Sequence, residues 1–334
     1  MFFKGKKVLV IGGTGTIGRG IVKTILGQSP DVIRVFSRDE HKQHELQNEW
    51  GKREDLRYLI GDVRDYDRVH TAMQGIDYVF HLAAMKHVPS CEYNPYEAVL
   101  TNVHGTNNVV RAALAQGVKK VVFTSTDKAI SPTNAYGATK LTAERLITAA
   151  EYSKGWGQTV FASVRFGNVM GSRGSVIPLF KKQILNKGKI TVTDRTMTRF
   201  MMTLEQATSL TIKALEEARG GEIFVLKMPV VALDDLASLV IKETCTQLGK
   251  DPEQIKVEEI GLRPGEKMYE ELMTNEESLT AWELDDMYVI PYSFKKDVPY
   301  KNAKKAAPGM YSSSGQSPIS AVQLYELLKS QGLI

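Results

Sequence analysis

Cysteine is scarce in this chain, and long apolar runs are missing. Its 334 residues include only 2 cysteines, Cys91 and Cys245, which lie far apart without metal-ligand spacing, and the 6 histidines form no ligand set. We therefore expect no disulfide framework, no metal and a reducing, cytoplasmic location. No apolar stretch reaches the ~20 residues of a membrane helix, and the start lacks a signal-peptide core. The sequence predicts a soluble protein without membrane contact.

A large charge of one sign is also missing. The chain has 43 Lys and Arg against 38 Asp and Glu, a formal net charge of +5, and its basic residues are spread along the sequence. Nucleic-acid binding is not expected, because proteins with that function concentrate basic residues in patches. A mildly basic chain does suit a small acidic ligand such as a nucleotide diphosphate.

What the sequence does contain is an alternation of short apolar runs and longer helical patterns. Strands are predicted at residues 7–11, 32–36, 56–60, 78–82, 120–124 and 160–165. This repetition predicts an α/β fold with a doubly wound, parallel, Rossmann-type sheet. The alternation of strand and helix patterns ends near residue 170, so we expect a nucleotide-binding domain over residues 1–170. A smaller, mainly substrate-binding lobe should span residues 171–334 and return segments to the main domain, with an irregular surface excursion at 299–318 and a helix at 319–333.

A glycine-rich loop joins the first predicted strand to the first helix. It reads Gly12-Gly13-Thr14-Gly15-Thr16-Ile17-Gly18. Glycines at this place permit a tight turn and a close approach of the backbone to a pyrophosphate, which then rests on the helix N-terminus. We therefore expect a dinucleotide cofactor, bound by Gly12, Thr14, Gly15, Thr16, Ile17 and Gly18.

The end of the second strand indicates which dinucleotide binds. NAD enzymes usually carry an acidic residue there, which binds the ribose 2′-hydroxyl. This chain instead has Ser37 followed by Arg38, with Lys42 one turn later. A hydroxyl and cationic groups suit a 2′-phosphate through charge-assisted hydrogen bonds, so the predicted cofactor is NADP.

Candidate catalytic residues follow the fifth strand. Thr126, Asp127 and Lys128 lie just beyond its carboxyl end, the edge at which open α/β sheets bind ligands. Tyr136 and Lys140 are four residues apart on a predicted helix and therefore share one face. Because a neighbouring ammonium favours phenolate, we expect Lys140 to lower the pKa of Tyr136 and Tyr136 to act as a base.

Over roughly residues 5–170 the chain resembles the extended short-chain dehydrogenase/reductases. The resemblance rests on the glycine loop, on the pair Tyr136 and Lys140, and on Thr126 in the place of the family's hydroxyl residue. It implies that Tyr136 and Lys140 also contact the cofactor, and that Asp62 and Val63 contact its adenine.

A closer resemblance, over most of the chain, is to UDP-N-acetylglucosamine 4,6-dehydratases, especially the soluble inverting type that begins pseudaminic acid synthesis. It implies a lyase with tightly bound NADP, because the hydride taken from carbon 4 returns to carbon 6. Lys128 would remove the carbon 5 hydrogen, Asp127 would protonate the departing carbon 6 hydroxyl, and Thr126 would bind near carbon 4. The shared segments are SRDEHKQ (37–43), GDVRDYDR (61–68), AAMKHVPSCEYNP (83–95), TNVHGT (101–106), STDKAISPTNAYGATK (125–140), RFGNVMGSRGSVIPLF (165–180), MTRF (197–200) and RPGEK (263–267).

The same resemblance implies a UDP-sugar substrate and a set of residues that bind it. The stretch after the fourth strand borders the sugar, a glycine-serine loop could meet the diphosphate, and the RPGEK segment resembles one that holds the uridine ribose and phosphate. The expected substrate-binding residues are Lys86, Asn168, Arg173, Arg199, Arg263 and Glu266. We also expect a homo-oligomer.

Other functions stay open at this point. A related dehydratase could stop early and release a 4-keto-5,6-ene to a partner reductase. A UDP-sugar 4-epimerase has no need of Asp127 and Lys128, and a non-catalytic NADP-binding sensor has no need of several titratable residues in one cleft. Tyr136 favours inversion at carbon 5, because relatives that keep the gluco configuration often carry methionine there.

Overall fold

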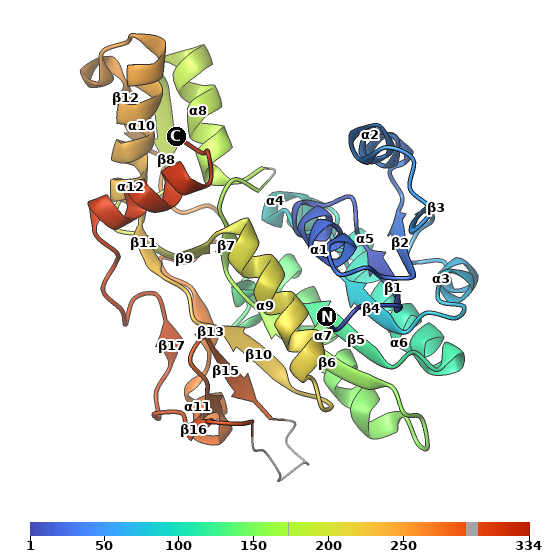
Figure 1. Cartoon of the computed structure of the whole chain (residues 1–334). Helices are drawn as coiled ribbons and strands as arrows, with labels where there is room; N and C mark the ends of the chain where they lie inside the picture. Colours follow the sequence, from blue (N-terminus) through green and yellow to red (C-terminus); the bar gives the residue numbers. More distant parts are fainter. Residues whose placement is uncertain (173, 292–299) are drawn as a thin grey trace.

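The computed structural model describes residues 1–172, 174–291 and 300–334 (Figure 1). Its strands are β1 (Lys7–Ile11), β2 (Val32–Ser37), β3 (Leu56–Ile60), β4 (Tyr78–His81), β5 (Lys120–Thr124), β6 (Val160–Arg165), β7 (Asn168–Val169), β8 (Lys189–Val192), β9 (Thr198–Met202), β10 (Ile223–Leu226), β11 (Val230–Ala232), β12 (Lys256–Glu259), β13 (Glu271–Met273), β14 (Trp282–Glu283), β15 (Met287–Ile290), β16 (Lys304–Lys305) and β17 (Tyr311–Ser312). Its helices are α1 (Thr16–Leu26), α2 (Glu40–Trp50), α3 (Tyr66–Ala72), α4 (Val88–Tyr93), α5 (Pro95–Ala98), α6 (Gly105–Gln116), α7 (Ala135–Ser153), α8 (Val176–Lys187), α9 (Leu204–Glu217), α10 (Leu233–Leu248), α11 (Asn275–Thr280) and α12 (Ala321–Ser330). Shorter turns are the π-helical η1 (Val99–His104) and the 3-10 turns η2 (Asp127–Ala129) and η3 (Pro252–Gln254).

The strands predicted from apolar runs form the parallel part of one large sheet. In the described residues its order is β16-β14-β15-β10-β6-β5-β4-β1-β2-β3, and the strands from β10 to β3 run parallel. Val8 pairs with Ile33 of β2 on one side and with Tyr78 of β4 on the other. The order 3-2-1-4-5-6 within this sheet is typical of dinucleotide-binding folds. The predicted doubly wound α/β class is therefore confirmed.

Helices cover both faces of the parallel strands (Figure 1). Side chains of α1 and α9 share one hydrophobic core with strand residues such as Val8 and Val10. Side chains of α3, α6 and α7 share a second core with the intervening residues, such as Leu9 and Ile11. Successive strand residues point to opposite faces, and a strand covered on both faces is apolar throughout. This is why the central strands read as unbroken apolar runs.

The smaller lobe has a core of its own, in which α8, α10 and α12 pack together around residues such as Phe180 and Val240. It is tied to the main sheet by β9, because Phe200 and Met202 belong to the core of the sheet while Met201 belongs to the core of the lobe. The chain thus passes continuously from one core to the other. The division near residue 170 stays a prediction.

Later segments extend the main sheet. β10 pairs in parallel with β6, and β15 pairs antiparallel with β10. The predicted irregular excursion at 299–318 is confirmed for most of its described part, which is exposed and irregular, but Lys304–Lys305 and Tyr311–Ser312 form the short strands β16 and β17. Tyr311 and Ser313 are buried there, and the Tyr311 ring lies 4.9 Å from the Phe200 ring, centroid to centroid. Burial of this aromatic side chain holds a serine- and glycine-rich segment against the protein.

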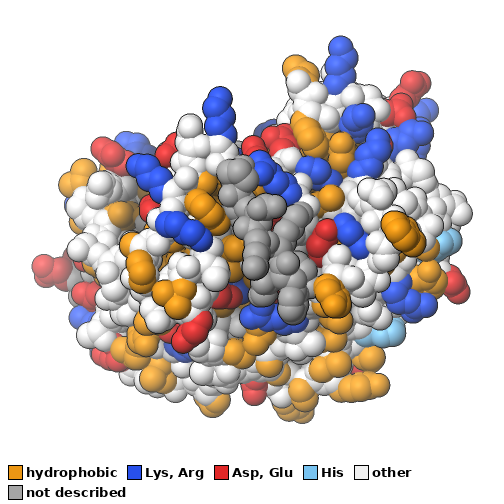
Figure 2. All heavy atoms as spheres, turned by 90° about the horizontal axis from the view of Figure 1, so that it is seen from below, with side chains coloured by type: hydrophobic (Ala, Val, Ile, Leu, Met, Phe, Trp, Pro, Cys, Tyr) orange, Lys and Arg blue, Asp and Glu red, His pale blue; other side chains and the backbone are white. Residues whose placement is uncertain are grey.

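Charged side chains of both signs are interspersed over the face drawn in Figure 2, with apolar side chains scattered between them. Neither charge forms a continuous stripe on that face. Within the parts of the chain that the structure describes, no helix is long and apolar enough to cross a membrane.

Candidate active site

A cavity of about 900 Å³ lies at the carboxyl ends of the parallel strands. It is adjacent to the point where the strand order reverses, between β1 and β4, which is where doubly wound sheets bind ligands. Its lining comes from the loop after β1, the ends of β2, β4 and β5, the start of α7 and the loop after β7. The fold therefore brings the glycine loop and the candidate catalytic residues to one hollow.

The glycine loop is shaped by positions that have no room for a side chain. Gly12 has a φ of 83°, and a Cβ there would lie 2.8 Å from Ala83 N. A Cβ on Gly18 would lie 2.5 Å from Gly12 O, so its absence lets α1 begin directly against the loop. This cradle at a helix N-terminus fits the pyrophosphate of a nicotinamide dinucleotide. The predicted loop residues all line the cavity: Gly12, Thr14, Gly15, Thr16, Ile17 and Gly18.

The residues predicted to bind a 2′-phosphate lie together at the end of β2. Ser37, Arg38 and Lys42 all line the cavity. The Ser37 hydroxyl accepts a hydrogen bond from Gln43 Nε2 at 3.0 Å, which leaves its own hydrogen available to donate. The Arg38 side chain is 57% exposed, and its Nη1 lies 3.6 Å from Asp62 Oδ2. The two cations and the hydroxyl therefore face one end of the cavity.

The two predicted adenine contacts differ. Val63 lines the cavity, whereas Asp62 does not and is held by Arg64, whose Nε donates to Asp62 Oδ2 at 3.0 Å. Burial acts to raise the pKa of Asp62, but the hydrogen bonds from Arg64 outweigh it and hold the pKa below its ordinary value. Contact between Asp62 and an adenine stays a prediction.

Tyr136 and Lys140 extend from the first turns of α7 into the cavity. Burial raises the pKa of Tyr136 to about 12, against the effects of a hydrogen bond with Thr126 and of the charge on Lys128. Burial lowers the pKa of Lys140 to about 7, and Lys140 Nζ donates to Thr124 O at 2.6 Å. The structure thus differs from the expectation that Lys140 lowers the pKa of Tyr136. Burial raises this pKa by more than the neighbouring cation lowers it, and that cation is Lys128 instead of Lys140.

The turn after β5 holds a buried cluster of titratable groups. Thr126 Oγ1 donates to Asp127 Oδ1 at 2.8 Å, and Lys128 Nζ lies 3.1 Å from the same oxygen. Thr126 and Lys128 line the cavity, whereas Asp127 is 1% exposed and is not part of the lining. Asp127 Oδ2 has no hydrogen-bond partner among the residues that the structure describes. Thr126 and Lys128 therefore hold the carboxyl group through Oδ1.

Glu270 completes the cluster and was not among the predicted site residues. It is 3% exposed, and its Oε1 lies 3.1 Å from Lys128 Nζ and 3.7 Å from Arg199 Nε. Burial acts to lower the pKa of Lys128, but Asp127 and Glu270 outweigh it and raise the pKa. Burial and the neighbouring Asp127 raise the pKa of Glu270. Backbone contacts with Ser313 hold Glu270 in place, and no local sequence pattern reveals that pairing.

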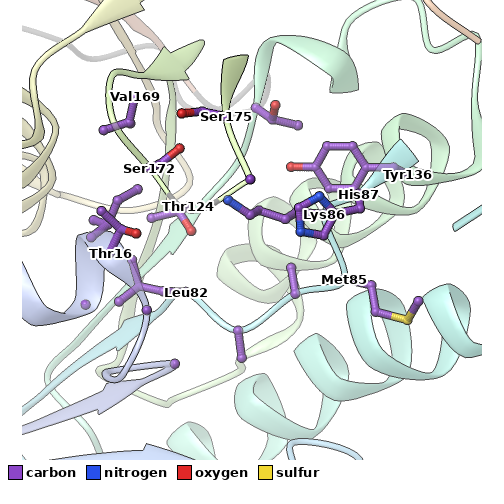
Figure 3. Close-up of a pocket in the computed structure, with 18 of the residues that line it drawn as sticks. Thr16, Leu82, Met85, Lys86, His87, Thr124, Tyr136, Val169, Ser172 and Ser175 are labelled. Carbon is purple, nitrogen blue, oxygen red and sulfur yellow. The ribbon is translucent and has the colours of Figure 1, made fainter. Parts of the chain in front are cut away.

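Lys86 reaches the cavity from the loop after β4. In Figure 3 the side chains of Lys86 and Tyr136 point into the same space. Asn102, within η1, fixes this loop, because it accepts from Met85 N at 2.8 Å and donates to Met85 O and to Thr139 Oγ1 at 3.0 Å. Asn102 was not among the predicted site residues. π-Helical turns are frequent at functional sites, but their position is not evident from sequence.

A second cavity, of about 200 Å³, adjoins the first. Lys128 and Asn168 line both cavities, while Arg199 and Glu266 line the smaller one. Arg199 donates hydrogen bonds to three backbone carbonyl oxygens, so its guanidinium is held in one place. The predicted substrate residues Asn168, Arg199 and Glu266 therefore surround the smaller cavity, and Lys128 lies where this cavity meets the larger one.

One predicted substrate residue is not brought to either cavity. Arg263 is exposed and belongs to neither lining, whereas Gly265, two residues later, is anchored to the start of α7 by a hydrogen bond from Asn134 Nδ2 to its carbonyl, at 2.8 Å. Arg173 lies outside the described residues. Substrate contacts of both arginines stay predictions.

Relatives carry several different names. Over 292 residues, 87% of each chain, the sequence is 51% identical to an uncharacterized membrane protein of Methanocaldococcus jannaschii. It is 40% identical to a UDP-N-acetylglucosamine 4,6-dehydratase (inverting) of Campylobacter jejuni, over 98% of both chains. It is also 42% identical to a UDP-glucose 4-epimerase of Rickettsia rickettsii, over 86% of this chain and 84% of that one.

The solved structure of Pen from Bacillus thuringiensis is similar over the whole length, with 62% identity, a TM-score of 0.95 and full coverage of both chains. The dTDP-glucose 4,6-dehydratase DesIV from Streptomyces venezuelae shares the fold, at 22% identity and a TM-score of 0.68 over 78% of this chain and 86% of that one. A family model described as "Polysaccharide biosynthesis protein" matches residues 8–292. The chain therefore belongs to this polysaccharide biosynthesis family, which has the extended short-chain dehydrogenase/reductase fold that its motifs predicted.

Proposed function

We propose that this protein is a UDP-N-acetylglucosamine 4,6-dehydratase that inverts carbon 5 and uses a bound NADP. The observation that carries the proposal is the cluster of Asp127, Lys128 and Glu270 directly beside Tyr136 and Thr126. Oxidation at carbon 4 needs a single base and a hydroxyl. Loss of water across carbons 5 and 6 needs a further base and a further acid, and this cluster offers both.

The names of the relatives support two candidate reactions. The Campylobacter relative, which matches over 98% of both chains, is named a 4,6-dehydratase, and the Rickettsia relative is named a 4-epimerase. A 4-epimerase works at carbon 4 alone and has no use for a buried acid-base cluster around Lys128. The dehydratase is therefore our leading proposal, and the epimerase is the second candidate.

In the proposed reaction, the bound nicotinamide supplies the acceptor and later the donor of a hydride. Tyr136 removes the proton of the carbon 4 hydroxyl, and Thr126 holds the oxygen of that group. Lys128 removes the hydrogen of carbon 5, which the neighbouring ketone makes acidic. Asp127 then gives its proton to the hydroxyl that departs from carbon 6, which leaves as water.

The Thr126 hydroxyl lies between the first base and the acid. Thr126 Oγ1 donates to Asp127 Oδ1 at 2.8 Å and is also hydrogen-bonded to Tyr136. Over one cycle the substrate loses a proton from its carbon 4 hydroxyl to Tyr136, and Asp127 loses one with the water. Transfer from Tyr136 through Thr126 to Asp127 would restore both groups. The product, a UDP-4-keto-6-deoxy-N-acetylhexosamine, would suit a bacterial surface-sugar pathway such as pseudaminic acid synthesis.

The proposal is tested by following UDP-N-acetylglucosamine with the purified protein in deuterated water by NMR. The expected product gains a methyl group and a 4-keto carbon, carries deuterium at carbon 5, and forms without net consumption of NADP. The couplings of neighbouring protons report whether carbon 5 is inverted. UDP-N-acetylgalactosamine without carbon 5 deuterium would establish the epimerase instead. Accumulation of a 5,6-ene would assign the hydride return to another protein.

A further inference from the structure

Lys128 lies between two buried carboxylates. Its Nζ is 3.1 Å from Asp127 Oδ1 and 3.1 Å from Glu270 Oε1. Arg199 is the other cation at Glu270, with Nε at 3.7 Å. The titratable and charged groups that face Glu270 therefore come from η2 and β9, and Ser313 holds its backbone from the side of β17.

This environment conflicts with the use of Lys128 as a base. An ammonium that lies between two carboxylates keeps its proton, because each anion stabilises the charged form. Only the neutral amine has a lone pair that can accept the carbon 5 hydrogen. Lys128 must therefore pass its proton to another group before the elimination, and that group must lie within hydrogen-bond reach.

Glu270 is the group that meets this need. Asp127 already has a part in the proposed reaction, because it must be protonated to donate to the departing hydroxyl. Glu270 Oε1 is equally close to Lys128 Nζ, while Glu270 Oε2 is buried without a hydrogen-bond partner among the described residues. An unpartnered carboxylate oxygen in a buried site is poorly stabilised as an anion, which favours its protonation.

We propose that Glu270 is a positioning residue that accepts the ammonium proton of Lys128 and so converts Lys128 into the base for carbon 5. This inference rests on the proposed dehydratase function. Glu270 acts through Lys128, and contact between Glu270 and the substrate is not required.

The steps balance in protons and electrons. First, the N–H bond of the Lys128 ammonium breaks, an O–H bond forms on Glu270, and the ion pair becomes a neutral pair. Next, the amine of Lys128 takes the carbon 5 hydrogen as a proton, and the electron pair of the C–H bond passes to the ketone as an enolate. The enolate then expels the carbon 6 hydroxyl, which takes the proton of Asp127. Finally, hydride that the bound nicotinamide would return to carbon 6 gives a new enolate, which takes a proton from solvent at the opposite face of carbon 5. Lys128 keeps the proton that it removed, and Glu270 releases its proton to solvent.

The experiment compares Glu270→Gln with the wild-type protein over a range of pH, following three signals for UDP-N-acetylglucosamine. These are the absorbance of the reduced cofactor, deuterium entry at carbon 5 and formation of the methyl product. In the wild type the proton stays inside the cluster, so the elimination rate should be flat around neutral pH. In Glu270→Gln the proton of Lys128 must leave to solvent, so the rate should rise about tenfold per pH unit and be about 100-fold lower at neutral pH. Oxidation should stay within about threefold, because Glu270 does not contact Tyr136 or Lys140.

Two further variants separate this role from a structural one. Glu271→Gln removes the adjacent buried carboxylate, which faces Lys267 Nζ at 3.1 Å instead of Lys128, and should keep the flat pH profile. Glu270→Asp keeps the acid on a shorter side chain and should keep the flat profile at a reduced rate. Thermal unfolding of each variant reports whether it is folded.

The outcomes are distinguishable. A slope of about one in the pH profile, seen in Glu270→Gln alone, supports the proposal. An unchanged elimination rate and profile in Glu270→Gln, or an equal loss of oxidation and elimination with a flat profile and a raised KM, overturns the role of Glu270 but leaves the dehydratase function intact. A wild-type protein that forms only an epimer, without carbon 5 deuterium, overturns the dehydratase function and the role of Glu270 with it.

Discussion

Tyr136 and Lys128 line the same cavity but are proposed to act on different atoms of the substrate. Tyr136→Phe removes the base for the carbon 4 hydroxyl, so we expect no absorbance of reduced cofactor when substrate is added. Lys128→Ala leaves that base in place, so the absorbance should appear, but no deuterium should enter carbon 5. Each loss should be about 100-fold or more in the affected step. Stopped-flow absorbance and NMR on the same samples provide the measurement.

A suitable control for the second variant is Lys119→Ala. Lys119 is an exposed lysine that pairs with Asp77 Oδ1 at 2.7 Å, just before the other end of β5. It should behave as the wild type in both measurements. If Tyr136→Phe and Lys128→Ala lose oxidation and elimination equally, the division of roles between them is wrong.

At the scale of secondary-structure elements, we expect the junction of β2 and α2 to decide between the two nicotinamide dinucleotides. Ser37 ends the strand, and Arg38 and Lys42 line the cavity beside it. NADP should bind more tightly than NAD, because the 2′-phosphate gains charge-assisted hydrogen bonds there. Arg38→Ala should weaken NADP binding by about 1.5–3 kcal/mol, roughly 10- to 100-fold, and change NAD binding little. Isothermal titration with both dinucleotides measures this.

The matched control is Arg53→Ala. Arg53 pairs with Asp55 Oδ2 at 2.8 Å and does not line the cavity. Both dinucleotides should bind this variant as they bind the wild type. A wild-type protein that prefers NAD would contradict the role assigned to the end of β2.

At the scale of the whole molecule, Arg165 joins parts of the chain that are far apart in sequence. It is 0% exposed in β6, and its guanidinium pairs with Glu144 Oε1 of α7 at 2.6 Å and with Glu277 Oε2 of α11 at 2.8 Å. Arg165→Met would leave two buried carboxylates without their cation. We expect it to lower the free energy of unfolding by about 3–5 kcal/mol, measured by urea denaturation.

The pH dependence of this stability follows from Glu277. Burial acts to raise the pKa of Glu277, but hydrogen bonds from Arg165 outweigh it and lower the pKa. A depressed carboxyl pKa adds stability above the pKa of the unfolded chain, and this is lost as the pH falls through the folded value. The wild type should therefore lose more stability towards acid than Arg165→Met. The control variant is Arg145→Met. The Arg145 side chain is 58% exposed, and its Nη2 lies 4.0 Å from Glu277 Oε1, so its loss should lower the free energy of unfolding by at most about 1 kcal/mol. An equal cost for both variants would contradict the role of the buried pairs.

Local sequence patterns determined the parallel sheet of this molecule and the loop and helix at its carboxyl edge. The apolar runs predicted the parallel strands, because a strand covered on both faces must be apolar throughout. The glycine loop and the pair Tyr136 and Lys140 could also be predicted from the sequence. The loop is a run of adjacent residues, and the two side chains lie one helical turn apart. A property that depends on a few adjacent residues is visible in the sequence.

Only the tertiary structure decided the environment of those residues. Glu270 reaches Lys128 across more than a third of the chain, and Asn102 fixes the loop of Lys86 from a π-helical turn. Burial, and not the charge of Lys140, dominates the pKa of Tyr136. Charge, burial and contact are set by whatever packs around a side chain in space. Local sequence does not contain that information, because the partners come from distant segments.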